Sequence, residues 1–183
     1  MGRPASDLRD RAVRAAIRLA ASDGASGVTF DAVAEAIGSS KGAVLHHFAT
    51  KDALLQAVVE GLVAEYRTTV ESVAAADPNP VGAFARAMLD CSTPTELNRA
   101  LRGLLAVILE RPDRSEPIRQ FYHWCYQHLL DDGIDPVHAG AVMLASDGMW
   151  LGELLGLPPL PDRIRSETHA WLRGLTRGVS AVP

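Results

Sequence analysis

Residues 29–55 read TFDAVAEAIGSSKGAVLHHFATKDALL, and this stretch predicts two short helices, a tight turn between them and the start of a third helix. Thr29 is suited to cap the first helix, because its hydroxyl can accept a bond from a free backbone N–H. Gly38 then suits the left-handed conformation that ends a helix. Ser40 can cap the second helix, residues 41–47. The apolar spacing predicts that Val33, Val44 and Phe48 face inward. This layout predicts a helix-turn-helix, whose second helix enters the DNA major groove.

The predicted DNA-binding face of this motif, residues 29–48, lies at the starts of its helices. Lys41 supplies a positive charge. Gly42 has no side chain, so backbone N–H groups at the start of the helix can approach a phosphate closely. His46 and Lys51 can donate to further phosphates. The predicted DNA-binding residues are Thr29, Ser39, Ser40, Lys41, Gly42, Ala43, His46 and Lys51. The turn and the residue spacing are also consistent with an alternative, an ordinary helical hairpin whose lysines are solvated surface residues.

The segment from about Arg11 to about Glu60 resembles the DNA-binding domain of the tetracycline-repressor (TetR) family of bacterial regulators. The matching positions include Leu19, Gly24, Thr29, Ala34, Ile37-Gly38, Ser40-Lys41-Gly42, His47-Phe48, Lys51 and Leu54-Leu55. The resemblance implies an all-α fold of about nine helices, in which a three-helix DNA-binding domain precedes a helical bundle for ligand binding and dimerisation. It also implies a homodimer that binds double-stranded operator DNA, most simply a repressor released by a small-molecule inducer.

Two positions depart from the family pattern. The family usually has Tyr where this chain has Leu45, and Thr where it has Ala43. Neither replacement can donate a hydrogen bond. The alternative function is therefore a small-molecule binding protein with weakened or lost DNA binding.

Charge is unevenly distributed over the 183 residues, whose formal net charge is −4. Residues 1–55 hold seven Lys and Arg against six Asp and Glu, and residues 56–183 hold 11 against 16. We therefore expect a DNA-binding domain over 1–55 with modest electrostatic steering. We expect residues 56–183 to form an acidic ligand-binding and dimerisation domain.

Compartment and chemical class follow from what the sequence lacks. No apolar run is long enough to span a membrane, and the N-terminus has no apolar signal core. Two cysteines, Cys91 and Cys125, fit a reducing cytoplasm. No phosphate-cradling glycine loop or nucleophile elbow supports an enzyme, and no cofactor is implied.

Prolines and capping residues divide the remainder of the chain into helices, and no two-residue alternation predicts a strand. Pro80 is suited to a first helical position. Thr93 and Glu96 form a capping box. The expected helices are 50–75, one that begins near 80, 93–110, 115–130, 136–155 and 162–178.

A ligand pocket is expected among the middle helices, because small-molecule sites are mostly apolar with a few polar groups. Asp147 is the most distinctive candidate, since it interrupts the apolar run AGAVMLASDGMWL. A structural hydrogen bond or ion pair inside the bundle, with Arg102 or Arg119 as candidate partners, is the alternative. The predicted ligand-binding residues are Phe84, Met88, Phe121, Tyr122, Trp124, Cys125, His128, Met143 and Asp147.

The last two helices are the expected dimer interface, because they carry large apolar side chains and two-fold dimers are the commonest oligomers. Intramolecular packing is the alternative. The interface residues are Trp150, Leu151, Leu154, Leu155, Ile164, Trp171, Leu172 and Leu175. No metal site is expected, because His123 points away from the face that Cys125 and His128 share.

Overall fold

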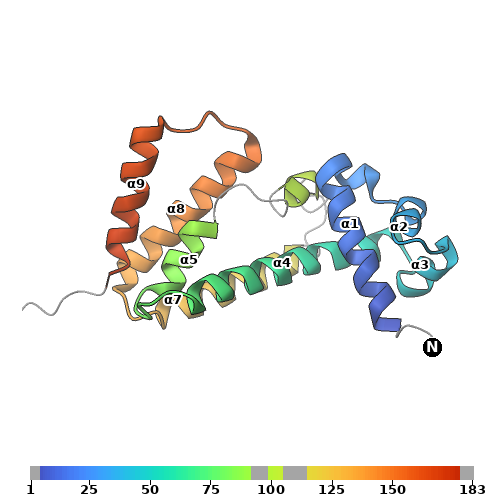
Figure 1. The fold of residues 1–183 in the computed structure, drawn as a ribbon, viewed down its shortest axis with the longest axis horizontal. Coiled ribbons are helices and arrows are strands. Elements are labelled where there is room, and N and C mark those ends of the chain that lie inside the picture. Colours follow the sequence, from blue (N-terminus) through green and yellow to red (C-terminus); the bar gives the residue numbers. More distant parts are fainter. Residues whose placement is uncertain (1–4, 92–98, 105–114, 178–183) are drawn as a thin grey trace, which may run out of the picture. The chain divides into compact units, whose positions relative to one another are not determined.

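The computed structural model describes residues 5–91, 99–104 and 115–177, which contain helices, turns and loops but no strand. Eight helices and the helical residues 99–104 make nine helical segments in these ranges (Figure 1), as predicted. The helices are α1 (Ala5–Gly27), α2 (Phe30–Ala36), α3 (Lys41–His47), α4 (Lys51–Ala75), α5 (Ala83–Cys91), α7 (Glu116–Leu130), α8 (Pro136–Leu155) and α9 (Asp162–Leu175).

The chain forms two compact units. Unit 1 consists of residues 1–65 with 95–119, and unit 2 consists of 66–94 with 120–183. The helix α4 therefore contributes its first part to unit 1 and its last part to unit 2. The predicted division of function near residue 55 stays a prediction.

Unit 1 is built around the motif that the sequence predicts. The helix α2 packs on α1 and on α3. The predicted inward residues Val33, Val44 and Phe48 are buried in one apolar cluster. At Gly24 the helix α1 is kinked (φ 67°, ψ −166°), a conformation that only glycine adopts readily. The backbone of Gly103 lies close to α1 there, since a Cβ on Gly103 would overlap the carbonyl oxygen of Ala20.

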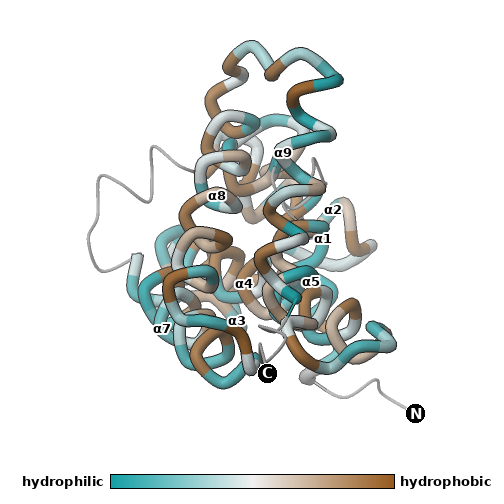
Figure 2. The backbone as a smooth tube through the Cα atoms, turned by 90° about the vertical axis from the view of Figure 1, so that its left-hand side faces the viewer, coloured by the Kyte–Doolittle hydropathy of each residue, from teal (hydrophilic) through white to brown (hydrophobic). Residues whose placement is uncertain are grey.

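Unit 2 packs α5 against α8 and α9, and α8 against α9. Eight of the nine residues of α5 are buried, so this helix is the centre of the unit. In Figure 2 hydrophobic residues recur along α8 and along the segment that joins it to α9. Several of them are exposed, including Leu144, Leu151 and Leu155.

The start of α5 is capped from a distance. The Asp132 carboxylate, in the turn that follows α7, accepts bonds from the backbone N–H groups of Phe84 (3.0 Å) and Ala85 (2.8 Å). Burial raises the pKa of Asp132, and these two bonds oppose that shift. The expectation that Pro80 opens this helix is wrong, because α5 begins at Ala83, where the cap supplies the missing acceptors.

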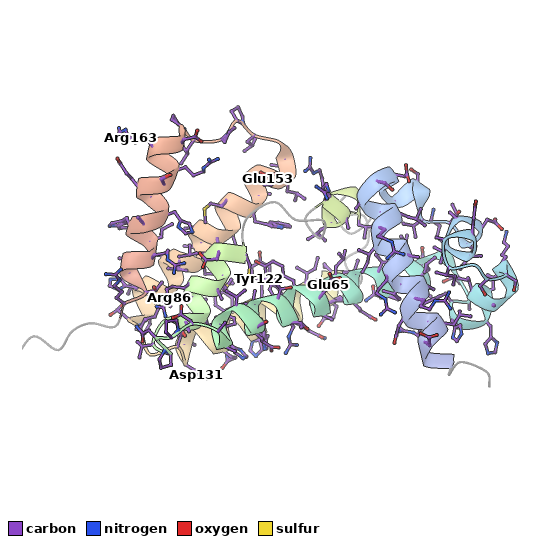
Figure 3. The ribbon with its side chains drawn as sticks, in the orientation of Figure 1. Glu65, Arg86, Tyr122, Asp131, Glu153 and Arg163 are labelled. Atoms are coloured by element: carbon purple, nitrogen blue, oxygen red, sulfur yellow. The ribbon has the colours of Figure 1, made fainter. Side chains whose placement is uncertain are left out.

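A second buried group, the guanidinium of Arg86 on α5, joins α5 to α9. It donates to the carboxylate of Asp77 (2.7 Å) and to the carbonyls of Asn79 (2.6 Å) and Val81 (3.0 Å). It also donates to the carbonyl and hydroxyl of Thr176, both at 3.2 Å. In Figure 3 Arg86 accordingly lies near the C-terminal end of α9.

The other expected helix limits agree closely with the structure. Thr50 caps α4, with its hydroxyl 3.0 Å from the N–H of Ala53. Asp135 caps α8, which ends at a left-handed Gly156. The predicted capping box at 93–96 lies outside the described residues. No helix in the described ranges is long and apolar enough to cross a membrane.

Candidate DNA-binding and effector sites

Local hydrogen bonds fix the turn of the helix-turn-helix. The hydroxyl of Thr29 accepts a bond from the N–H of Ala32 (3.1 Å), and that of Ser40 accepts one from Ala43 (3.1 Å). Gly38 between them has φ 62°, as its predicted helix-ending role requires. The turn is therefore set by residues within three positions of one another, which is why the sequence alone predicts it.

The solvent face of α3 is exposed where the sequence predicts DNA contact. Lys41 and Gly42 are exposed at the start of α3, and His46 is exposed in its last turn. Of the remaining predicted DNA-binding residues, Thr29, Ser40 and Lys51 are exposed, and Ser39 and Ala43 are partly buried. The structure thus leaves seven side chains and one glycine of the predicted set at or near the surface of unit 1.

The main cation on this face already has a partner that the sequence analysis missed. The Lys41 ammonium lies 2.8 Å from a carboxylate oxygen of Asp31 on α2, and both side chains are exposed. Exposed pairs of this kind contribute about 0–1 kcal/mol, so a phosphate can compete with Asp31 for the ammonium. Asp31 and Lys41 lie ten residues apart on different helices, so no helical spacing in the sequence indicated this pair.

Unit 2 brings most of the predicted ligand-binding residues into one cluster. Phe84, Met88, Cys125 and Met143 are buried there, with Phe121, Tyr122 and Trp124 partly buried against them. His128 is exposed, but its ring lies 4.4 Å from that of Trp124. The predicted set is therefore contiguous in space.

Asp147 and Tyr122 form the polar part of this cluster. The Tyr122 hydroxyl on α7 donates to Asp147 on α8 at 2.9 Å (Figure 3 labels Tyr122). Asp147 therefore makes a structural hydrogen bond, as the alternative expected, but its partner is Tyr122; the Arg119 guanidinium bonds Glu116 and Ser115. Burial raises the pKa of the half-buried Asp147 carboxyl, and the bond from Tyr122 opposes this shift.

Aromatic rings and one cation surround this pair. The Phe84 ring meets Trp124 edge-on at 5.2 Å, and Phe121 lies 5.7 Å from Trp124. The Arg67 guanidinium on α4 stacks over Trp124, 4.4 Å from the ring centre. Sequence reasoning missed Arg67, which lies in a helix assigned to no site. Arg67 is therefore a cation–π partner of Trp124 within unit 2.

Cysteine and histidine chemistry in the cluster is limited by burial. Burial raises the pKa of the Cys125 thiol to about 12, so the thiol stays protonated at neutral pH. Cys125 is fully buried whereas His128 is exposed, so they do not share a ligand face. Among the described residues no group of three His, Cys, Asp or Glu side chains is placed to hold a metal.

A separate cleft of about 440 Å³ lies elsewhere in unit 2, outside the predicted ligand-binding set. Arg86, Arg173 and Arg177 line it, together with Asp77, Pro78 and Asn79. Two of its arginines are already bonded, Arg86 to Asp77 and Arg173 to Asp90 at 2.6 Å. Two of the three arginine side chains that line the cleft are therefore already paired with carboxylates.

The predicted interface residues separate into two groups. Leu154 and Leu172 are buried within the single chain, and Trp150 and Leu175 are partly buried. Exposed apolar side chains remain on both helices, namely Leu151, Leu155, Ile164 and Trp171. Trp171 is 63% exposed, which is unusual for so large an apolar side chain.

Two family models match the chain. Residues 12–58 match bacterial regulatory proteins of the tetR family, and residues 82–177 match the tetracyclin repressor-like C-terminal domain. No curated protein sequence matches the chain significantly.

Solved structures share the fold over nearly the whole chain. A transcriptional regulator from Rhodococcus sp. Rha1 is 20% identical, with a TM-score of 0.73 over 96% of this chain and 99% of that one. A TetR-family member from Streptomyces coelicolor A3 is 24% identical, with a TM-score of 0.68 over 91% and 98%. The multidrug binding protein EbrR, in complex with ethidium, is 25% identical, with a TM-score of 0.67 over 90% and 98%.

Proposed function

The chain belongs to the TetR family of DNA-binding transcriptional regulators, and from that premise we propose that it is a repressor released from its operator by a small molecule. The observation that carries the proposal is the capped helix-turn-helix in the region that matches the family model, with the solvent face of α3 exposed. The repressor would act in the cytoplasm as a homodimer on a palindromic site.

Operator contact would combine cations with backbone amides. Lys41, His46 and Lys51 would reach phosphates, and the N–H groups at the start of α3 would add directional bonds. Two copies of this face would sit one DNA turn apart, about 34–36 Å, if the dimer is two-fold. This geometry requires the two recognition helices to be held rigidly.

The exposed apolar side chains of α8 and α9 support a dimer. Leu151, Leu155, Ile164 and Trp171 would bury their surface against the same residues of a second copy, as a two-fold interface requires. Sedimentation velocity at micromolar concentration should give a dimer, and Trp171→Glu should shift it toward monomer. A wild-type protein that sediments as a monomer would overturn this part of the proposal.

The effector would bind in the aromatic cluster of unit 2. Asp147, Tyr122 and the ring of Trp124 suit a small molecule with apolar rings and a positively charged or hydrogen-bond-donating group. The ethidium complex of EbrR motivates the choice of ethidium as a probe. Titration calorimetry without DNA should show binding that Asp147→Asn weakens at least tenfold, whereas Asp131→Asn, at an exposed site, should leave it unchanged.

DNA binding is tested separately. A duplex from beside the chain's own gene should bind with salt-sensitive affinity, and Lys41→Ala should weaken that binding without altering ethidium affinity. The pairing of Lys41 with Asp31 and the missing hydroxyls at Ala43 and Leu45 favour a second candidate, a binding protein that has lost its operator. Ethidium binding without any salt-sensitive duplex binding would select this second candidate.

A further inference from the structure

The solvent face of α3 has no hydrogen-bonding side chain at its centre. At about 100° per residue, Leu45 lies about 40° from Lys41 and about 60° from Gly42 on the same face. Lys41 and His46 form the two edges of the exposed arc, and the buried Val44 lies outside it, about 100° from Leu45. Leu45 is therefore the main side chain in the middle of the face.

The polar groups at the edges of this face have their own contacts. The Lys41 ammonium bonds Asp31 at 2.8 Å, which draws it toward α2. The His46 ring meets the His47 ring edge-on at 5.5 Å. These contacts leave the centre of the face to Leu45, whose side chain is 38% exposed.

The major groove offers one apolar group on a base edge, the C5 methyl of thymine. The other recognition groups there are hydrogen-bond donors and acceptors, which a leucine side chain cannot satisfy. A leucine at the centre of a helix in the major groove therefore distinguishes thymine from the other bases by packing against its methyl group. Gly42 beside it lets the helix approach closely enough for that contact.

We propose that Leu45 is a specificity-determining residue that reads a thymine methyl group in each operator half-site. The proposal rests on the docking of α3 in the major groove, which belongs to the proposed function. It predicts an operator with a thymine at one fixed position in each half-site. Lys41 and His46 then position the protein on phosphates, and Leu45 contributes the choice of base.

Uracil in place of thymine provides the test, because it removes the methyl group and leaves the hydrogen-bonding edge unchanged. Duplexes are first selected from a random-sequence library with the wild-type protein, and each thymine of the consensus is then replaced by deoxyuridine. Fluorescence anisotropy should show an affinity loss of about fourfold at one thymine per half-site, as expected for losing one buried methyl group. Leu45→Ala should bind the thymine duplex more weakly and be indifferent to the replacement at that position.

Two further variants make the result specific. Leu45→Met keeps an apolar side chain and should retain the methyl dependence. Val73→Ala truncates an apolar residue of α4 that is also 38% exposed, and it should behave as the wild type does. If Leu45→Ala keeps the wild-type uracil pattern while folded by circular dichroism, the proposal is wrong although DNA binding stands. If the wild type selects no duplex, the repressor function fails and this proposal fails with it.

Discussion

Replacing Arg86 with alanine should destabilise unit 2 by about 3–5 kcal/mol. The side chain of Arg86 is only 8% exposed, and its guanidinium satisfies backbone acceptors in two separate segments. A buried acceptor left without a donor costs about 1–3 kcal/mol, and a part-buried one costs less. The carbonyl of the fully buried Thr176 belongs to the first kind, and the carbonyls of Asn79 and Val81 belong to the second. The Thr176 hydroxyl keeps its bond to the Arg173 carbonyl, whereas the carboxylate of Asp77 loses its paired cation.

Tryptophan fluorescence is the appropriate assay, because all three tryptophans of the chain lie in unit 2. Urea unfolding followed at the tryptophan emission therefore reports on the unit that Arg86 stabilises. Protein concentration must be held constant, since any dimer makes the apparent stability depend on it. The expected loss corresponds to a large shift of the urea midpoint at an unchanged slope.

A matched control separates the buried network from the mere loss of an arginine. Arg163 pairs with Glu167 at 2.8 Å, but its side chain is 75% exposed. Arg163→Ala should therefore change the unfolding free energy by no more than about 1 kcal/mol. If Arg86→Ala proves as mild as Arg163→Ala, the claim that Arg86 joins α5 to α9 is refuted.

Three further predictions concern other contacts. The guanidinium of Arg86 holds the pKa of Asp77 below its usual value, so the contribution of this ion pair to stability is present above pH about 4 and is lost on further acidification. The effect of Asp77→Asn on urea unfolding should therefore shrink between pH 7 and pH 3, and a constant effect would contradict this. Gly103→Ala should destabilise unit 1 because the added methyl overlaps the α1 backbone, whereas Gly140→Ala, where nothing lies within 4 Å, should be neutral or stabilising in thermal melts. Asp31→Ala frees Lys41 for a phosphate, so anisotropy titrations should show tighter operator binding and a steeper salt dependence; an unchanged slope would count against Lys41 as a phosphate contact.

The features predicted correctly from sequence are those set by near neighbours. Thr29, Gly38 and Ser40 act through bonds within three positions, so capping preference and spacing were sufficient to predict the motif. Hydrophobic periodicity likewise predicted the burial of Val44 and Phe48. The fold class followed from the accumulation of such local signals, together with the family resemblance.

The features missed from sequence depend on partners far along the chain. The cap of α5 is Asp132, 48 positions from Phe84, so the local sequence pointed to Pro80 as the helix start. Arg86 is one of two charged residues in the largely apolar helix AFARAMLDC, and its acceptor at Thr176 is 90 positions away. An arginine among the apolar residues of this helix was the available signal for a buried polar network.

The remote cap of α5 also has a consequence for the order in which unit 2 folds. An isolated helix of nine residues is scarcely stable in water, and α5 obtains its two N-terminal acceptors only once Asp132 has arrived. The chain must therefore close a loop of nearly fifty residues before α5 can persist. In a pulsed hydrogen-exchange experiment, the amides of α5 should gain protection together with the end of α7, and not before it.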